Sequence, residues 1–342
     1  MSVVYFEMLV GVPGCGKSTY AKKMEALGYV WISSDKIREE LYGSEEIQGN
    51  PKDVFAKMYE RTFEALNEGK EVVYDATNIK RKDRMSLLAE IDKRVKEKVY
   101  KKCSYFAVDP SICKERNSKR ERTVPEEVID KMLKTFEVPV YREGWDFVSN
   151  AAKIVDAYQY EADYARTFEH NNKHHKETVG EHMEMAASAY IKDKLDSISA
   201  NGYFPSPSSK EERLYDEIWA ALRHHDEGKL YTKVNYRYVK NEKVPSEDSH
   251  YYGHANYGAY LFLSALAWAP SDFKNYLWEN NISGLDVAAL IENHMNFYFW
   301  KDNVPREFIR FWGEEFVEKL KIIHKYDMLG RRTEENDEQK SE

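Results

Sequence analysis

The sequence predicts an α/β domain with a parallel sheet flanked by helices, followed by an all-α domain. The chain has 342 residues, and at roughly 150 residues per domain two domains are expected. Between residue 3 and about residue 148, short apolar runs alternate with helical patterns, as in α/β proteins. After Asn150, strand signals largely stop and long, aromatic-rich helical patterns follow.

The elements of the first half follow from these patterns in order. We expect strands at residues 3–10, 29–32, 71–74 and 99–108. Residues 17–27 predict a helix closed by Gly28, and a second helix follows from apolar side chains at helical spacing over residues 54–66. Residues 124–127, Val-Pro-Glu-Glu, open another helix, because proline and acidic side chains are favourable in a first turn.

In the second half, helices are expected at residues 177–191, 211–223, 254–268, 285–294 and 305–329. A Pro/Ser-rich stretch at residues 204–209 predicts a loop. We place the first domain at residues 1–152, the second at 163–332, and a polar tail at 333–342.

The composition is that of a folded protein outside the membrane. Apolar residues make up 42% of the chain, and no apolar run approaches the ~20 residues of a membrane span. The N-terminus lacks the pattern of a signal peptide, and the three cysteines form no CxxC motif. These features predict free thiols and a cytoplasmic protein.

The charge balance argues against broad nucleic-acid binding, with one local exception. The chain carries 59 acidic and 51 basic residues, a net charge of −8. Residues 80–122, however, contain 15 basic and 7 acidic residues, a net of +8. This segment is either a solvated helix face or a path for a polyanion.

Residues 11–18, GVPGCGKS, match the phosphate-binding pattern GxxxxGK[ST] between a predicted strand and a predicted helix. Backbone N–H groups of such a loop surround phosphate oxygens, the lysine reaches the terminal phosphates, and the serine holds Mg²⁺. The pattern predicts an ATP site made by Gly11, Gly14, Cys15, Gly16, Lys17, Ser18 and Thr19.

Polar residues follow the next two predicted strands. Asp35 can accept the proton of an attacking hydroxyl, or it can cap a helix; Arg38 can hold an anionic acceptor. Asp75 and Asn78 lie where Mg²⁺ and acceptor are expected. Further along, Arg116 and Arg120 are four residues apart and predict one face of a helical lid over the transferred phosphoryl group.

This arrangement resembles the P-loop polynucleotide 5′-kinases of RNA repair, on the segments GVPGCGKST, SSDKIR, DATN and RNSKRERTVP. The resemblance implies that Lys17 and Ser18 bind ATP and Mg²⁺. It makes Asp35 the general base for a 5′-hydroxyl and Arg38 the contact to the acceptor phosphate. Arg120, with Arg116, would support transfer, and which lid arginine matters most stays open.

All 10 histidines follow residue 169. Residues 224–229, HHDEGK, accompany further histidines and an aspartate on helical patterns, and such groups from several helices form sites for divalent transition metals. Each single histidine could instead be a core residue. The candidate ligands are His182, His225, Asp226, His254, His294 and Asp327.

The order H…HD…H…H…D resembles the HD phosphohydrolase superfamily, which implies one or two ions such as Mn²⁺, Ni²⁺, Co²⁺ or Zn²⁺ with Asp226 bridging them. Spacing alone leaves His224 or His225 as the ligand, and the HDxGK register favours His225. Lys229 and His175 would contact the substrate phosphate.

Together the halves are similar to polynucleotide kinase-phosphatases that heal RNA ends before a separate RNA ligase. We expect a bifunctional enzyme acting on RNA or DNA ends, with ATP as donor and no membrane partner. One alternative is a nucleoside or metabolite kinase fused to an HD nucleotidase or phosphodiesterase. A second is a nucleotide-sensing module with degenerate sites.

Overall fold

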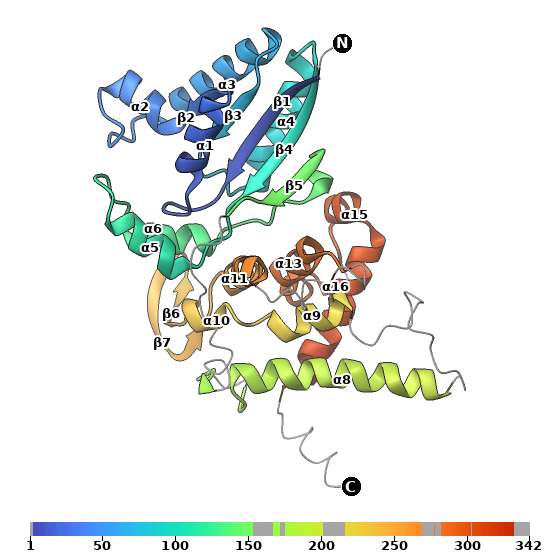
Figure 1. The fold of residues 1–342 in the computed structure, drawn as a ribbon. Helices are drawn as coiled ribbons and strands as arrows, with labels where there is room; N and C mark the ends of the chain where they lie inside the picture. The colour runs from blue at the N-terminus through green and yellow to red at the C-terminus, as the bar shows by residue number, and fades with distance from the viewer. Residues whose placement is uncertain are drawn as a thin grey trace. The chain divides into compact units, whose positions relative to one another are not determined.

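The computed structural model describes residues 3–152, 167–171, 175–200, 216–268, 277, 282–301 and 303–331. The chain divides into two compact units, Met1–Asp156 and Ala157–Glu342, here called unit 1 and unit 2 (Figure 1). Most of the predicted linker (residues 153–162), the predicted loop at 204–209 and the tail at 333–342 lie outside the described residues.

Unit 1 is built on a five-stranded sheet in the order β2-β3-β1-β4-β5, with every neighbouring pair parallel (Figure 1). Because parallel strands need crossover connections, helices alternate with the strands. The strands are β1 (Val3–Val10), β2 (Val30–Ser33), β3 (Val72–Asp75), β4 (Lys98–Tyr105) and β5 (Phe147–Asn150). The helices are α1 (Lys17–Ala26), α2 (Ser34–Tyr42), α3 (Pro51–Asn67), α4 (Arg81–Arg94), α5 (Pro110–Ser118) and α6 (Glu126–Leu133), with a 3₁₀ turn, η1 (Tyr141–Glu143).

The predicted parallel sheet is confirmed, and the four predicted strands are present with ends displaced by up to three residues. The sequence patterns missed β5, because its four residues FVSN hold only two apolar side chains at the sheet edge. Gly28 closes α1 with φ 101°, a left-handed value that favours glycine.

A buried ion pair braces the loops of unit 1 against α4. Arg84 is fully buried and donates from Nη2 and Nε to Glu143 at 2.6 and 2.7 Å. Glu143 also accepts from Trp145 Nε1 at 3.0 Å, and Arg84 Nη1 donates to the backbone oxygen of Asn78 at 3.0 Å. These bonds tie α4 to η1 and to the loop after β3.

Unit 2 is largely helical, with α9 at its centre: α9 contacts α8, α13 and α16. Its helices are α8 (Val179–Ala200), α9 (Glu217–His224), α10 (Lys229–Thr232), α11 (His254–Trp268), α13 (Gly284–Asn293), α14 (Asn296–Trp300), α15 (Arg306–Trp312) and α16 (Glu314–Leu329). The predicted helix 254–268 is confirmed to the residue. The predicted helix 305–329 is two helices, because Gly313 adopts φ 82° between them.

Unit 2 also holds an antiparallel hairpin that the all-α prediction did not contain, β6 (Val234–Val239) and β7 (Glu242–His250). Lys240 and Asn241 form its two-residue turn with φ values of 48° and 69°, and two positive φ values are typical of tight hairpin turns. The sequence lacks the usual Asn-Gly pair at this position, so the sequence patterns did not predict the turn. No helix among the described residues has the length and apolarity that crossing a membrane requires.

Candidate active sites of the two units

The loop after β1 is shaped for phosphate. Lys17 donates from Nζ to the backbone oxygens of Gly11 and Val12 at 2.8 and 2.9 Å, so its ammonium lies inside the loop. Gly14 has φ 80°, and a Cβ there would lie 2.1 Å from the backbone oxygen of Cys113. Gly16 has φ 101° directly before α1. Only glycine fits this path, and the path leaves backbone N–H groups and a helix N-terminus facing the same space.

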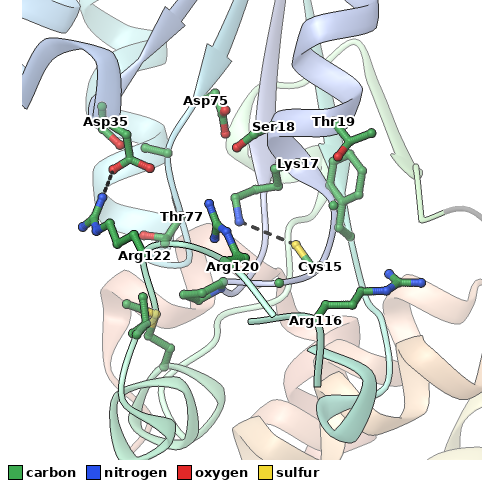
Figure 2. A pocket seen from close by; sticks show the side chains of 18 of the residues that line it. Cys15, Lys17, Ser18, Thr19, Asp35, Asp75, Thr77, Arg116, Arg120 and Arg122 are labelled. Atoms are coloured by element: carbon green, nitrogen blue, oxygen red, sulfur yellow. Dashed lines mark hydrogen bonds and ion pairs between the residues drawn. The ribbon is translucent and has the colours of Figure 1, made fainter. Parts of the chain in front are cut away.

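Asp35 stands in the first turn of α2, opposite the loop. The side chain that caps α2 is Ser33, whose Oγ accepts from the backbone N–H of Lys36 at 3.4 Å, so the N-cap alternative for Asp35 is wrong. The Asp35 carboxylate instead accepts from Arg38 and, at 2.9 Å, from Arg122 Nη1 (Figure 2). The Asp35 side chain is 34% exposed, and a carboxylate that accepts a proton from a substrate hydroxyl must be accessible in this way.

Asp75 closes the inner end of the site at the end of β3. It is 4% exposed and accepts from Trp31 Nε1 at 3.2 Å, and Ser18 is a further hydrogen-bond partner. Burial raises the pKa of Asp75, while Lys17 and the bonds from Ser18 and Trp31 oppose the rise. A carboxylate beside the loop serine is placed as a Mg²⁺-site residue would be, and Ser18 and Asp75 are the side chains that would hold that ion.

These groups line one cavity of about 1150 Å³ (Figure 2). The predicted site residues on its wall are Gly14, Cys15, Gly16, Lys17, Ser18, Thr19, Asp35, Arg38, Asp75, Arg116 and Arg120. Its other lining residues include Phe55, Val128 and Met132, which give it an apolar side. The cavity therefore joins a phosphate loop, the carboxylates of Asp35 and Asp75, four arginines (Arg122 is the fourth) and an apolar wall.

The predicted lid differs in detail. Helix α5 ends at Ser118, so Arg116 lies on a helix but Arg120 lies in the loop beyond it, and the expected shared helical face is wrong. Lys119 caps the C-terminus of the helix, and Asn117 fixes the loop by accepting from and donating to the backbone of Val124. Arg122, the last arginine of the segment RNSKRERTVP, is not among the predicted site residues. It pairs with Asp35, as Arg38 does, and lies across the view from Arg116 (Figure 2).

Two predicted residues lie outside the cavity wall. Asn78, expected near the acceptor, has φ 49° and donates from Nδ2 to the backbone oxygen of Leu9 at 2.7 Å. Its amide ties the ends of β1 and β3 together. Gly11 donates from its backbone N–H to Thr77 O at 3.0 Å and holds Lys17 through its own oxygen. Both act on the shape of the site.

In unit 2 the six predicted ligands converge from five places in the sequence. His182 lies in the first turns of α8, His225 and Asp226 directly follow α9, His254 begins α11, His294 follows α13, and Asp327 lies in α16. All six are buried. Gly228 permits the approach: a Cβ there would lie 2.0 Å from the backbone oxygen of His254.

Asp226 has one carboxylate oxygen on each side of the cluster. Its Oδ2 lies 3.5 Å from His182 Nε2 and 3.6 Å from His225 Nε2, and Asp327 Oδ1 lies 3.0 Å from His182 Nε2. Its Oδ1 lies 3.4 Å from His254 Nε2 and 3.7 Å from His294 Nε2. The arrangement makes two ligand sets that share one aspartate.

The chemistry of this donor set fits divalent metal ions. The Nδ1 atoms of His225, His254 and His294 lie 2.7–2.9 Å from backbone oxygens three residues earlier, which assigns their protons to Nδ1. The Nε2 lone pairs of His254 and His294 then face each other at 3.2 Å. Burial lowers the pKa of His254 to about 3, so the ring stays neutral. Two facing lone pairs beside a carboxylate form a donor set that fits a cation.

Further groups orient these ligands. Tyr298 donates its hydroxyl to Asp327 Oδ2 at 2.8 Å, and Glu177 Oε1 lies 3.6 Å from His182 Nδ1. Burial opposes ionisation of Asp226, but Lys229 and the facing histidines prevail and hold its pKa well below the usual range. Lys229 Nζ is 2.6 Å from Asp226 Oδ2, so the predicted phosphate contact is an ion pair in this structure.

The structure places His225, and not His224, in the cluster. His224 Nδ1 lies 2.6 Å from Glu227 Oε1, whereas His225 Nε2 lies 3.3 Å from His182 Nε2. His175, predicted to contact substrate, lies beside this cluster with its ring centroid 4.9 Å from that of His182. His170, which the sequence left as a surface or core residue, stacks on His175.

Comparison with known proteins places the match within unit 1. Residues 7–139 match the family model described as "AAA domain". This match, together with the parallel sheet and its phosphate loop, indicates a P-loop fold in unit 1. No curated protein matches the chain.

Several solved structures are similar to part of the chain. A structure of the Pnkp1/Rnl/Hen1 RNA repair complex is 20% identical over 38% of this chain and 42% of that chain, with a TM-score of 0.32. A fungal RNA kinase is 16% identical over 46% and 78%, with a TM-score of 0.35. A gluconokinase from Sinorhizobium meliloti 1021 is 21% identical over 43% and 82%, with a TM-score of 0.30. The chain thus spans less than half of the repair-complex chain, and likenesses this weak do not identify a substrate.

Besides Arg122 in unit 1, sequence reasoning missed three residues that the structure brings to the site of unit 2: Tyr298, Glu177 and His170. Tyr298 is four residues after His294 and could be found only by knowing that α14 packs on α16. Glu177 precedes His182 by five residues, a spacing that places it just before α8. His170 lies five residues before His175, and this spacing alone does not separate a ligand from a core histidine.

Proposed function

We propose that the protein heals polynucleotide ends, adding a 5′-phosphate from ATP in unit 1 and removing a 2′- or 3′-phosphate by metal-dependent hydrolysis in unit 2. The observation that carries the proposal is the pairing of two complete sites in one chain. One is a phosphate loop facing Asp35 across a cavity of about 1150 Å³. The other is a buried double ligand set sharing Asp226.

In the kinase step, Asp35 accepts the proton of the attacking 5′-hydroxyl. The hydroxyl oxygen bonds to the γ-phosphorus of ATP, the bond from that phosphorus to the β-phosphate oxygen breaks, and ADP leaves. Lys17 and the loop N–H groups hold the phosphates, and Arg116 and Arg120 offset the charge of the transferred group. Arg38, next to Asp35, is placed to hold the acceptor's own phosphate. Mg²⁺, held by Ser18 and Asp75, would neutralise charge on the nucleotide.

In the phosphatase step, His182, His225 and Asp327 would form one metal site with Asp226, and His254 and His294 the other. Divalent ions there would supply an activated water and neutralise the leaving oxygen. Lys229 forms an ion pair with Asp226 in this structure. If metal ions bound the Asp226 carboxylate, they would replace Lys229 there, and its ammonium could then hold a phosphate oxygen.

Two groups of basic residues support a polynucleotide over a small metabolite. The first lies in unit 1, where residues 80–122 have a net charge of +8 in the sequence. Part of this excess pairs with acidic residues outside the segment, as Arg84 does with Glu143 and Arg122 with Asp35. The second lines a cavity of about 530 Å³ in unit 2, which includes Tyr298, the partner of Asp327. Its basic lining residues are Lys301, Lys321, Lys325 and Arg331. A polynucleotide carries more negative charge than a single nucleotide, so it gains more from binding these basic residues.

The test is one incubation with ATP, Mg²⁺, Mn²⁺ and an oligonucleotide that carries a 5′-hydroxyl and a 3′-phosphate, read by mass spectrometry. The 5′ end should gain one phosphoryl group and the 3′ end should lose one. Parallel reactions with RNA, DNA and a 2′,3′-cyclic phosphate define the preferred end. A charge reversal of Lys321 to Glu should weaken oligonucleotide turnover more than turnover of a mononucleotide.

The rival functions predict other outcomes in the same assay. A nucleoside or metabolite kinase fused to a nucleotidase would turn over mononucleosides and mononucleotides and leave both oligonucleotide ends unchanged. A nucleotide-sensing module would bind ATP without turnover. Either result contradicts end healing.

A further inference from the structure

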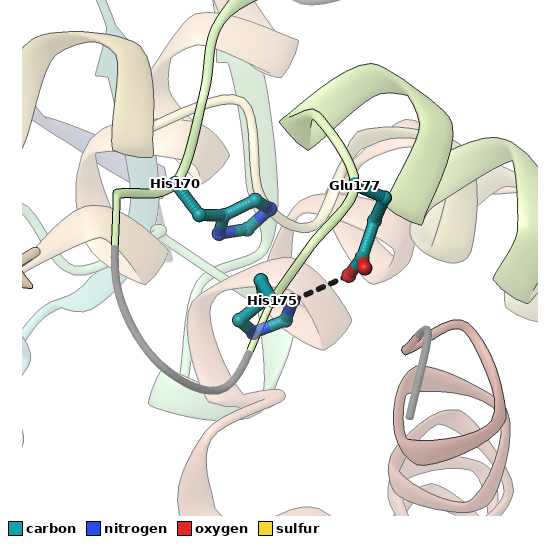
Figure 3. A group of neighbouring side chains, drawn as sticks. All are labelled: His170, His175 and Glu177. Carbon is teal, nitrogen blue, oxygen red and sulfur yellow. Dashed lines mark hydrogen bonds and ion pairs between the residues drawn. The ribbon is translucent and has the colours of Figure 1, made fainter. Parts of the chain in front are cut away.

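A third group of metal-binding side chains lies beside the Asp226 cluster and shares no residue with it. It consists of His170, His175 and Glu177, each of which offers one ligand atom within 4.8 Å of the others. The rings of His170 and His175 stack with centroids 3.9 Å apart and planes 6° from parallel (Figure 3). His175 Nδ1 lies 2.6 Å from Glu177 Oε1.

Burial makes this group unusual. His170 is 1% exposed and Glu177 2% exposed. Neither ring nitrogen of His170 has a hydrogen-bond partner within the described structure. A buried polar nitrogen without a partner is destabilising, because it has given up its hydrogen bonds to water. His170 carries two such atoms. A phenylalanine ring could fill the same space without this cost, so packing alone does not account for the histidine.

We propose that His170, His175 and Glu177 bind a third divalent transition-metal ion. Two imidazoles and one carboxylate are a donor set that proteins use for such ions, and three protein ligands leave a coordination position open. The ion would give one of the two unpartnered nitrogens of His170 a partner. It would also balance the charge of the Glu177 carboxylate.

The chemistry of the group favours a cation over an anion. A phosphate placed between these side chains would face the Glu177 carboxylate, and like charges in a buried site repel strongly. The neighbouring ligand His182 has its Nδ1 3.6 Å from the same carboxylate. Glu177 therefore lies between the third site and the first pair of ligands, and an ion at the third site adds positive charge next to the place where unit 2 would bind phosphate.

The ion count tests the inference without any substrate. The full chain is loaded with Mn²⁺, freed of excess metal, and measured by inductively coupled plasma mass spectrometry. We expect three ions per chain in the wild type and two in His170→Ala. His250→Ala is the matched control, because His250 lies in the same unit with its Nε2 3.1 Å from Ser246 Oγ and belongs to no ligand group; it should keep three.

A second variant tests the third site by itself. Asp226→Ala removes the ligand that both other sets share, so it should keep one ion, with the electron paramagnetic resonance spectrum of an isolated Mn²⁺. Adding His170→Ala to it should abolish that spectrum while circular dichroism stays unchanged. A wild-type count of two, a count that His170→Ala does not lower, or an Asp226→Ala protein without bound Mn²⁺ overturns the third site.

These outcomes are separate from the proposed function. The metal count does not depend on a substrate, so a chain with three ions and no phosphatase activity refutes only the function. An active chain with two ions refutes only the third site.

Discussion

The candidate sites of the two units are built in opposite physical ways. Unit 1 has a cavity lined by the phosphate loop, Lys17 and four arginines, and its carboxylate Asp35 keeps 34% of its side chain exposed. Unit 2 has buried imidazoles and carboxylates, with His182, His225 and Asp226 all at most 2% exposed. In the proposed function, the first site holds phosphate with the protein's own positive charges, and the second holds it with charges that metal ions would bring.

The difference explains where each unit concentrates its structural constraints. Unit 1 depends on backbone path, so glycines such as Gly14 are required by steric contact. Unit 2 depends on protonation state, so backbone oxygens three residues before His225, His254 and His294 fix the protons of these histidines. Changes that remove charge should therefore act on one unit at a time.

The largest expected effect is the complete separation of the two activities by single variants. Asp226→Ala removes the carboxylate shared by both ligand sets, so phosphate release should fall to background while 5′ phosphorylation stays within twofold. Lys17→Ala removes the ammonium inside the phosphate loop and should lower 5′ phosphorylation by about 10²–10³-fold. Radiolabel transfer and phosphate release measure the two activities on one oligonucleotide.

Removal of metal ions should separate the two activities as well. A chelator that strips transition metals, followed by Mg²⁺ alone, should reproduce the effect of Asp226→Ala in the wild type. If Lys17→Ala leaves 5′ transfer unchanged, the assignment of unit 1 is wrong; if it abolishes phosphate release, the two sites do not act independently.

The next largest effect concerns stability. Arg84→Met leaves the Glu143 carboxylate buried without its main partner, which should lower the unfolding free energy of unit 1 by about 3–5 kcal/mol. In calorimetry, the unfolding transition of unit 1, recognised because ATP shifts it, should move to a lower temperature. The transition of unit 2, recognised because a chelator shifts it, should stay where it is. Arg94→Met is the control: Arg94 pairs with Glu90 on the surface, and its loss should cost less than about 1 kcal/mol.

A smaller effect tests the outer contacts of unit 2. Tyr298→Phe removes the hydroxyl that holds Asp327, so metal affinity should fall about 10–100-fold without loss of fold. Titration with Mn²⁺ measures it. Tyr326→Phe, one residue before Asp327, removes a hydroxyl that bonds Asp193 and should leave metal affinity unchanged. Equal affinity in the two variants would mean that Tyr298 does not position Asp327.

Sequence motifs located candidate site residues more readily than the contacts around them. The phosphate loop and the segment HHDEGK are short local motifs, so Lys17 and Asp226 could be singled out from sequence alone. The pairing of Arg122 with Asp35 joins residues 87 positions apart, and the helix break after Ser118 that allows it has no strong sequence signal. Tertiary packing decided those contacts.

The fold shows the same limit. The parallel strands β1, β2 and β3 carry mainly apolar runs and were predicted, and the more polar β4 was predicted together with the apolar residues 105–108 that end its run. Strand β5 is short and lies at an edge. The hairpin β6 and β7 is largely exposed, so it lacks the apolar pattern that marks a buried strand. Asn78 could not be separated from the acceptor site by sequence, because its bond to the backbone oxygen of Leu9 spans 69 residues.

The smallest expected effect sets stability against activity in unit 1. Burial raises the pKa of Asp75 above its usual value, so the stability its protonated form contributes is present at low pH and is lost as pH rises through the raised pKa. At pH 7 the folded chain therefore carries a costly buried carboxylate. Asp75→Asn removes that charge and should raise the melting temperature of unit 1 at pH 7, in the absence of nucleotide and Mg²⁺, while lowering 5′ phosphorylation.

The gain in melting temperature should shrink as pH falls toward about 4, where unfolded carboxyl groups also take up protons. Asp35→Asn, which loses its bonds to two arginines, should give no such gain. Differential scanning calorimetry across this pH range decides the matter, since a gain that is independent of pH would arise from packing and not from the buried charge.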